Sequence, residues 1–351
     1  MAKIMILGDL HIGVKQGNIV MMEQHLRYIE EQFIPYLLNN NIKTIIQTGD
    51  MFDCRKGATT LALREWKLRF FDVLLDKGIQ LHTYIGNHDL YYRNKITPNT
   101  TTEYLSHYNN INIIEKPSNV TIEGCNFLIV PWICNENEEA CMESIQTSKS
   151  NICIGHFEIK GAKMEGTVCT EGLPISTFDR FERCISGHFH IKGDYENVSY
   201  VGTPTQSSWG DYGITKGVHV LDTETLELDF ITNTEELFHK ITYNEDRNMK
   251  LVLSNDYTDK YIKVVIEHRE DFKKYEKWMM QVEDKGAASL TVIEPFLDRS
   301  SDDSEVEVDG ALDVLTTDNI IKQYIAEVYP EKAEALTTFM LGIHTTAIRE
   351  Y

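Results

Sequence analysis

The feature that most constrains the fold of this chain is a series of five short polar motifs, each placed directly after a run of apolar residues. They are Asp9-Leu10-His11, Gly49-Asp50-Met51-Phe52-Asp53, Gly86-Asn87-His88-Asp89, Gly155-His156 and Gly187-His188-Phe189-His190. The apolar runs predict buried strands, and the amphipathic stretches between them predict helices. We therefore expect a layered α/β domain whose polar motifs collect at the carboxyl ends of strands, where such domains bind ligands.

The expected elements follow from these periodicities. Strands are predicted over 4–7, 44–47, 80–85, 127–131, 152–154, 184–186 and 217–221, and helices over 21–38 and 61–75. Beyond Tyr243 a small α/β unit is expected, with strands 261–266 and 288–293 and a helix over 271–282. An acidic, Ser-rich linker follows at 297–310, and 316–351 reads as two amphipathic helices divided at Pro330.

The residue types in the five motifs are those of a two-metal hydrolase. Residues i and i+2 of an extended segment point the same way, so Asp9 and His11 are placed to bind one ion together. Asp50 ends a strand between the two pairs of ligand residues, Asp9 with His11 and His188 with His190, and is therefore placed to bridge two ions. Two divalent ions bring four positive charges and the two aspartates cancel two of them, so the site would attract a phosphate ester. The mixed nitrogen and oxygen ligands favour manganese, iron or zinc over calcium.

This ordered set resembles the calcineurin-like metallophosphoesterase family over residues 1–245. The resemblance implies a four-layer α/β sandwich in which two mixed sheets are flanked by helices. It implies one metal bound by Asp9, His11, Asp50 and His190, and a second bound by Asp50, Asn87, His156 and His188. His88 would contact the scissile phosphate and help to protonate the leaving oxygen. Asp53 is either the carboxylate that orients His88 or a surface residue, and Asp89 is expected only to shape a turn.

Three later features resemble the DNA double-strand-break-repair nucleases of that family, and most of all their bacteriophage members. Tyr200-Val201-Gly202-Thr203-Pro204 matches a block of that subfamily, a small capping domain follows, and two helices close the chain. The implied organisation is a nuclease domain at 1–245, a capping domain at 246–297, an acidic linker at 298–312 and a partner-binding segment at 313–351. In such nucleases the closing helices bind a coiled-coil ABC-type ATPase. The residues expected to do so here are Ile321, Tyr324, Ile325, Val328, Leu336, Phe339 and Met340.

The resemblance further implies DNA as substrate, manganese (with magnesium as the alternative) as cofactor, and a homodimer within a heterotetramer. The dimer face is expected on 61–75 and 101–108. The helix over 61–75 has more apolar residues than a single buried stripe needs, namely Leu63, Trp66, Phe70, Phe71 and Leu74. The alternative is that this helix is fully buried in the core. DNA contacts are expected from the loops that follow the second and third motifs, through Arg55, Lys56, Tyr91, Tyr92, Arg93 and Lys95. The alternative is that these loops are ordinary polar surface.

Composition limits the other functions that this chain could have. The net charge is −20, from 34 basic and 54 acidic residues, which argues against DNA binding through overall charge. Metal ions, a local basic patch or a basic partner would have to supply the missing charge. The seven cysteines form no CxxC pair and are expected to be reduced thiols. No apolar run reaches the ~20 residues of a membrane span, and the N-terminus reads as a strand, so a cytoplasmic protein is expected (in the host, if a phage encodes it).

Two other functions remain open from the sequence. A protein phosphatase or a nucleotide phosphodiesterase could use the same site, because the family hydrolyses many phosphate esters. A non-catalytic scaffold with a vestigial site is the second alternative, and the complete set of ligand residues argues against it.

Overall fold

The computed structural model describes residues 2–164, 167–293, 325, 336–338 and 340. The chain divides into two compact units, Met1–Pro295 and Phe296–Tyr351. In the second unit, Ile325 is buried and Met340 is exposed. The expected linker and the expected partner contacts Ile321, Tyr324, Val328 and Phe339 lie outside the described residues. The architecture below is that of the first unit.

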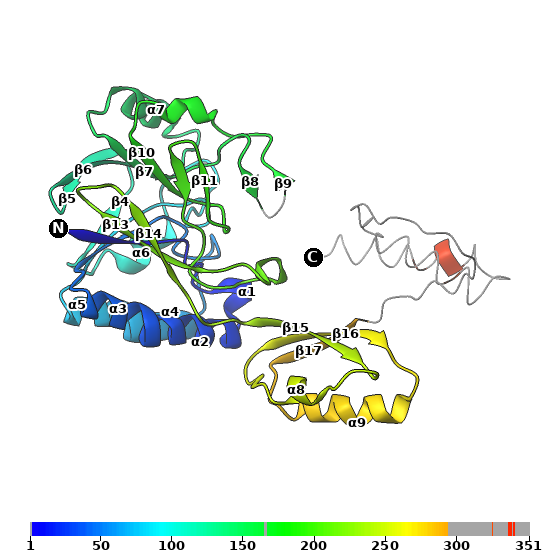
Figure 1. Cartoon of the computed structure of the whole chain (residues 1–351). Helices are drawn as coiled ribbons and strands as arrows, with labels where there is room; N and C mark the ends of the chain where they lie inside the picture. The colour runs from blue at the N-terminus through cyan, green and yellow to red at the C-terminus, as the bar shows by residue number, and fades with distance from the viewer. Residues whose placement is uncertain (1, 165–166, 294–324, 326–335, 339, 341–351) are drawn as a thin grey trace. The chain divides into compact units, whose positions relative to one another are not determined.

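Two six-stranded mixed sheets form the centre of this unit (Figure 1). The first has the order β14 (Leu228–Thr232), β13 (Gly217–Asp222), β1 (Lys3–Leu7), β2 (Thr44–Gln47), β3 (Gln80–Tyr84), β4 (Ile111–Ile114). The second has the order β11 (Gly193–Tyr195), β12 (Val198–Tyr200), β10 (Arg183–Gly187), β7 (Ile152–His156), β6 (Cys125–Val130), β5 (Ser118–Ile122). β1 to β4 are parallel, as are β6, β7, β10 and β12, so each set brings its carboxyl ends to one edge.

Helices cover the outer face of each sheet. Along β1, Ile4 and Ile6 face the second sheet, while Met5 and Leu7 pack against helices, because successive strand residues point to opposite faces. Figure 1 shows the helices of residues 14–76 in blue along the first sheet and α7 (Glu138–Thr147) in green beyond the second sheet. The helices are α1 (Val14–Gly17), α2 (Ile19–Tyr28), α3 (Ile34–Asn39), α4 (Thr60–Trp66), α5 (Asp72–Asp76), α6 (Thr100–Leu105) and α7 (Glu138–Thr147). The predicted four-layer α/β sandwich is confirmed.

The two long helices predicted from sequence are each interrupted by a π-helical turn, at Ile29–Phe33 and at Lys67–Phe71. In the second helix Ala62, Trp66, Phe70 and Leu74 recur at intervals of four and are all buried. An interval of four is wider than the 3.6 residues of an α-helical turn, and a π turn accommodates the extra residue. These residues belong to the core, whereas Leu61, Leu68 and Leu75 of the same helix are exposed.

A three-stranded parallel sheet follows, made of β15 (Phe238–Asn244), β16 (Tyr261–His268) and β17 (Ser289–Ile293). The helix α9 (Phe272–Glu283) buries Tyr275, Trp278, Met279 and Val282 in the core of this sheet, and α8 (Lys250–Leu253) lies in the connection after β15. The small α/β unit expected after Tyr243 is therefore present. Its first strand, β15, lies before the expected boundary at 245, so strand pairing continues across that position.

The remaining elements are small. β8 (Lys163–Met164) and β9 (Thr167–Val168) form a two-stranded ribbon, and 3₁₀ turns occur at Ile175–Phe178 and Trp209–Asp211. All seven cysteines are free, as expected. Within the part of the chain that the structure describes, no helix combines the length and the apolar character that crossing a membrane requires.

Candidate metal centre

The five motifs meet where the carboxyl ends of the two sheets face each other. Asp9 follows β1, Asp50 follows β2 and Asn87 follows β3, all in the first sheet. His156 ends β7 and His188 follows β10 in the second sheet. His190, from the same loop as His188, meets His11 across 179 positions of sequence. The placement agrees with the general rule that α/β sheets bind ligands at strand ends.

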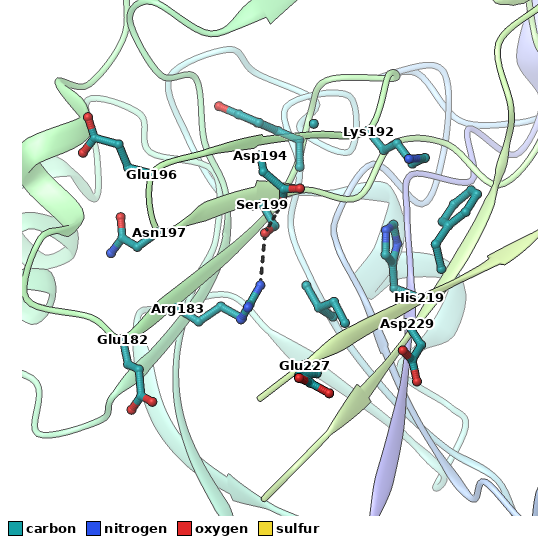
Figure 2. Close-up of a pocket in the computed structure, with 14 residues that line it drawn as sticks. Glu182, Arg183, Lys192, Asp194, Glu196, Asn197, Ser199, His219, Glu227 and Asp229 are labelled. Carbon is teal, nitrogen blue, oxygen red and sulfur yellow. Dashed lines mark hydrogen bonds between the residues drawn. The ribbon is translucent and has the colours of Figure 1, made fainter. Parts of the chain in front are cut away.

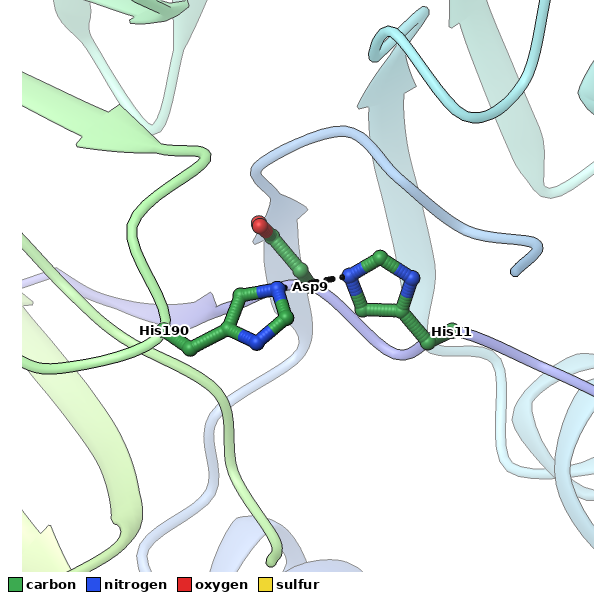
Figure 3. A group of neighbouring side chains, drawn as sticks. All are labelled: Asp9, His11 and His190. Atoms are coloured by element: carbon green, nitrogen blue, oxygen red, sulfur yellow. Dashed lines mark hydrogen bonds between the residues drawn. The ribbon is translucent and has the colours of Figure 1, made fainter. Parts of the chain in front are cut away.

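We call the residues expected to bind the first metal, Asp9, His11, Asp50 and His190, site A. The Nε2 atoms of His11 and His190 lie 3.0 Å apart, and ligand atoms of Asp9, His11 and His190 all lie within 4.8 Å of one another. Figure 3 shows the two imidazole rings turning their nitrogens toward each other beside the Asp9 carboxylate. Three side chains thus present lone pairs to one small space.

We call the residues expected to bind the second metal, Asp50, Asn87, His156 and His188, site B. Asn87 Oδ1 lies 3.0 Å from His156 Nε2 and 3.0 Å from His188 Nδ1. Asp50 Oδ2 lies 3.2 Å from His156 Nε2 and 3.9 Å from His11 Nε2 in site A. The Asp50 carboxylate is therefore the group that the two sites share.

Glycine before the ligands allows the strand ends to approach this closely. A Cβ atom at Gly86 would collide with Asp50 Oδ1, and one at Gly187 would lie 2.5 Å from Asp9 Oδ1. Either contact is far inside van der Waals distance, so a side chain at these positions would displace a carboxylate. The motifs therefore require Gly for space.

Three of the expected ligands adopt left-handed backbone conformations. The φ angles are 46° at His11, 49° at Asp50 and 86° at His188. Non-glycine residues rarely adopt such angles, and where they do the cost is about 1–3 kcal/mol each and the site is often functional. The surrounding fold, rather than local preference, holds these three side chains in place.

Backbone groups fix the carboxylates and one imidazole of the cluster. The backbone N–H of His188 donates to Asp9 Oδ2 at 2.9 Å, and that of His88 donates to Asp50 Oδ1 at 2.7 Å. His156 Nδ1 lies 2.8 Å from the Thr48 carbonyl oxygen, which can only accept a hydrogen bond. Nδ1 of His156 must then carry the hydrogen, which leaves Nε2 as the atom with a free lone pair.

The electrostatics of the cluster fit a cation. Burial raises the pKa of Asp9 to about 7 and lowers the pKa of His188 and of His190 to about 3 each, so both imidazoles are neutral at pH 7. Burial alone would lower the pKa of His156, but Asp50 and Asp9 raise it to about 9. In the protein alone a proton offsets the buried carboxylates. A divalent ion would offset them in its place, because metal binding displaces protons from its ligands.

His88 lies at the edge of site A, with its ring centroid 4.9 Å from that of His11. Its Nδ1 lies 2.7 Å from the backbone carbonyl oxygen of Asp53, so Nδ1 donates and Nε2 is left for another partner. The Asp53 carboxylate instead lies 3.3 Å from His11 Nδ1. From the sequence, this carboxylate was either the group that orients His88 or a surface residue; in the structure the backbone carbonyl of Asp53 contacts His88 and the side chain faces His11.

Asp89 has a larger part in the site than the turn residue expected from sequence. Its side chain is fully buried and accepts hydrogen bonds from the backbone N–H groups of Gly86, at 2.9 Å, and Phe52, at 3.1 Å. It therefore joins the second motif to the third and helps to hold Asp50 and Asn87 together. A charged residue at the end of the third motif was the only signal in the sequence, and nothing local indicated its burial.

The residues expected to contact DNA lie in loops that leave the cluster. Tyr91 and Tyr92 are 50% and 54% exposed, and their rings meet edge to face with centroids 4.8 Å apart. Arg93, Lys95 and Lys56 are also exposed, and Arg55 is half-buried. The structure thus places two aromatic rings and several cations at the surface, within a few residues of His88 and Asp53 along the chain.

A separate cavity of about 840 Å³ lies between β11–β12 and β13–β14 (Figure 2). Its lining includes Arg183, Lys192, Asp194, Ser199 and His219, and none of the residues of sites A and B. The carboxylates of Glu182, Asp194, Glu196, Glu227 and Asp229 outnumber its two cationic side chains. The chemistry of the five motifs is therefore located at the strand ends and not in this cavity.

Two packed mixed sheets with clustered carboxylate, amide and imidazole groups at their shared edge define a metal-dependent phosphoesterase. The calcineurin-like phosphoesterase family matches residues 2–192, and the chain belongs to this family, whose members use divalent metal ions. The protein is 34% identical over 330 residues to "Exonuclease subunit 1" of Enterobacteria phage T4, with 92% of each chain covered. The resemblance inferred from the motifs is confirmed.

Two further relatives are more distant. The chain is 24% identical over 393 residues to one of the subunits of the nuclease SbcCD of Staphylococcus epidermidis, covering 97% of this chain and 99% of the relative. It is 26% identical over 203 residues to "DNA double-strand break repair protein Mre11" of Sulfurisphaera tokodaii, covering 54% and 49%. These names agree with the branch of the family that the Tyr200–Pro204 block suggested.

Proposed function

We propose that the protein is a metal-dependent DNA nuclease, an exonuclease on duplex ends and an endonuclease on single strands, that acts in recombination, repair and recombination-dependent replication. One observation carries the proposal: the five motifs converge, with Asp9, His11 and His190 in one ligand group and Asp50, His156 and His188 in another, beside a third group of His11, Asp53 and His88. Asp50 Oδ2 lies 3.2 Å from His156 Nε2 and 3.9 Å from His11 Nε2, so it can join the first two groups. The similarity over 92% of the chain to a phage exonuclease subunit supports DNA as the substrate.

Two divalent ions would occupy sites A and B, with manganese as the expected metal and magnesium as the alternative. The mixed nitrogen and oxygen ligands suit manganese, iron or zinc better than calcium, and the resemblance to the repair nucleases selects manganese among these. When bound, such ions polarise a phosphate ester and lower the pKa of coordinated water toward ~7. The protein contributes the ligands, their fixed tautomers and the close approach of the strand ends.

His88 would contact the scissile phosphate and protonate the leaving oxygen. The Asp53 carbonyl holds its Nδ1–H, so Nε2 is the atom that would carry the transferred proton. Positioned acid catalysis of this kind contributes typically ~10²–10⁴-fold. The Asp53 carboxylate would act on the neighbouring His11, whose Nδ1 it faces.

DNA would be contacted by Arg55, Lys56, Tyr91, Tyr92, Arg93 and Lys95. Nucleic-acid surfaces combine cations that follow the phosphates with aromatic rings on which bases stack. The exposed Tyr91–Tyr92 pair and its basic neighbours provide both groups. Since the net charge of the chain is −20, we propose that a partner contributes much of the remaining affinity for DNA.

That partner would be a coiled-coil ABC-type ATPase bound by residues 313–351. The relatives from phage T4 and Staphylococcus epidermidis are both named as subunits, which supports a multisubunit nuclease. Deleting the residues after Gly310 should abolish capture of the ATPase and the activity that it stimulates. Basal manganese-dependent cleavage should remain, because every proposed ligand lies before Tyr195.

A homodimer within a heterotetramer would use the face built by 61–75 and 101–108. The buried Trp66, Phe70 and Leu74 are not available for it. Leu61, Leu68 and Leu75 are 43%, 47% and 42% exposed, so apolar side chains remain at the surface of this helix. Light scattering that gives only the monomer mass at micromolar concentration would contradict this dimer.

A cleavage assay tests the proposed function. Labelled linear duplex and single-stranded DNA would be incubated with the full chain in manganese, in magnesium or in EDTA, with and without the ATPase. EDTA should abolish cleavage and manganese should restore it. DNA left intact under every metal condition with the partner present would disprove the proposal, and hydrolysis of a phosphoprotein or cyclic nucleotide instead would select the alternative.

A further inference from the structure

Lys216 is a buried lysine at the start of β13, and its ammonium group contacts the loop that carries His190. The residue is only 4% exposed. Its Nζ atom lies 2.5 Å from Asp211 Oδ1, donates to the His190 carbonyl oxygen at 2.8 Å and donates to Thr203 Oγ1 at 2.9 Å. One cation therefore joins three segments beside site A.

These contacts match the bonding capacity of an ammonium group. Lysine has three N–H donors and no acceptor, and Asp211 Oδ1, the His190 carbonyl oxygen and Thr203 Oγ1 are all oxygen partners of this group. Burying an ammonium is costly unless it is paired and hydrogen-bonded. The Asp211 partner is itself only 2% exposed. A neutral side chain with one donor could not hold the His190 carbonyl, Thr203 and Asp211 together.

His190 and His156 are held in different ways. The His156 ring is fixed through its own Nδ1 by the Thr48 carbonyl. His190 is fixed through its main chain, since its carbonyl oxygen accepts from Lys216 Nζ and also from the Thr203 N–H at 3.1 Å. The direction of the His190 ring toward His11 therefore depends on how firmly this loop is held.

Asp211 connects Lys216 to the Thr203–Asp211 segment, which follows the proposed ligand His190 in sequence. Its Oδ2 accepts from the backbone N–H groups of Ser207, at 2.8 Å, and Ser208, at 3.0 Å. Gln206 Nε2 donates to the Asp211 carbonyl at 3.0 Å, and Gln206 Oε1 accepts from the N–H groups of Leu237, at 2.8 Å, and Phe238, at 3.2 Å. The Thr203–Asp211 segment is thus anchored both to Lys216 and to the start of β15.

We propose that Lys216 is a positioning residue for His190, which it aligns in site A by clamping the His190 carbonyl between Asp211 and Thr203. The inference rests on the proposed role of His190 as a metal ligand. Loss of the clamp should weaken the ion of site A far more than the ion of site B, because Lys216 contacts the His190 carbonyl, whereas His188 of site B has its own anchor through its N–H on Asp9 Oδ2.

The test is a manganese titration of the full-length protein by calorimetry, followed without substrate. Lys216→Met removes the ammonium and keeps the length of the side chain. It should lower the affinity of one of two ions by about 10–100-fold, the cost typical of losing a supporting residue. Lys192→Met is the matched control, since the exposed Lys192 contacts the Phe230 ring and no ligand; it should bind both ions as the parent does.

A double-mutant cycle separates positioning from general stability. In a His190→Ala background the Lys216→Met change should have no further effect on the remaining ion, because the group it positions is gone. Wild-type affinity for both ions in folded Lys216→Met would overturn the inference. If that variant fails to fold by circular dichroism, Thr203→Val decides: a several-fold loss at one ion is expected, and unchanged binding would overturn it. A parent chain that binds no ion would instead refute the proposed metal centre itself.

Discussion

The proposed ligands of sites A and B are similar in type but differ in what holds them in place. In site B, the His156 ring is oriented by the backbone carbonyl of Thr48. In site A, side chains take part in holding the imidazoles: the Asp53 carboxylate lies 3.3 Å from His11 Nδ1, and Lys216 shares the His190 carbonyl with the backbone N–H of Thr203. Backbone support is tied to the fold, whereas side-chain support is open to single substitutions. We therefore expect site A to be the easier of the two to weaken selectively.

The largest expected effect is a loss of metal affinity at both sites at once. Asp50→Asn takes away the carboxylate that lies 3.2 Å from His156 Nε2 and 3.9 Å from His11 Nε2. Both ions should bind weakly, and cleavage should fall by more than the ~100-fold that loss of a supporting residue costs. Metal content and cleavage rate measure this, with Asp76→Asn, a change at an exposed aspartate, as control. Loss of only one ion would show that Asp50 is not shared.

The second-largest expected effect is a loss of cleavage activity with metal binding unchanged at both sites. His88→Ala removes the proposed proton donor, and cleavage should fall ~10²–10⁴-fold. Manganese affinity should not change, because the structure places His88 beside the ligands with its Nδ1 on a backbone carbonyl. The same titration applied to His107→Ala, a change at an exposed histidine, provides the comparison. A His88→Ala protein that loses metal as severely as Asp50→Asn would refute the assignment.

A smaller and selective effect tests the comparison directly. Asp53→Ala removes the carboxylate near His11 but keeps the backbone carbonyl that holds His88. Site A should lose about 10–100-fold in metal affinity while site B keeps its own. Calorimetry should show two metal-binding steps, of which only one is weakened. Asp179→Ala, a change at an exposed aspartate, is the control and should leave both steps unchanged. Equal weakening of both steps would contradict the separation of the sites.

The smallest effect concerns the loop outside the ligand groups. Tyr92→Ala removes a ring that is 54% exposed, and base stacking on an aromatic ring is worth ~1–3 kcal/mol. Because the ring is at the surface, we expect the lower end of that range as weaker binding of single-stranded DNA, with metal affinity unchanged. Fluorescence anisotropy measures the binding. Tyr212→Ala is the control, and equal binding by both variants would remove Tyr92 from the DNA surface.

The sequence predicted most of the central strands because their signals are local. The apolar run before Asp9 coincides with β1, and 44–47 coincides with β2 (Thr44–Gln47). Strands with weaker periodicity, such as β11, β12 and β15, were not predicted, because their residues are chosen by pairing across the sheet. The π turns at Ile29–Phe33 and Lys67–Phe71 were missed because an interval of four residues is compatible with a continuous helix in a sequence pattern.

The sequence by itself determined the chemical types in the site and their order along the chain, since each motif is a local string of ligand residues after a strand. Only the tertiary structure decided which atoms meet. It directed the Asp53 carboxylate toward His11, buried Asp89 between two motifs and placed Lys216 under His190. Those contacts join segments distant in sequence, and they depend on backbone approach at Gly86 and Gly187 and on strained angles at three ligands. The packing of two sheets imposes that geometry, and no local pattern encodes it.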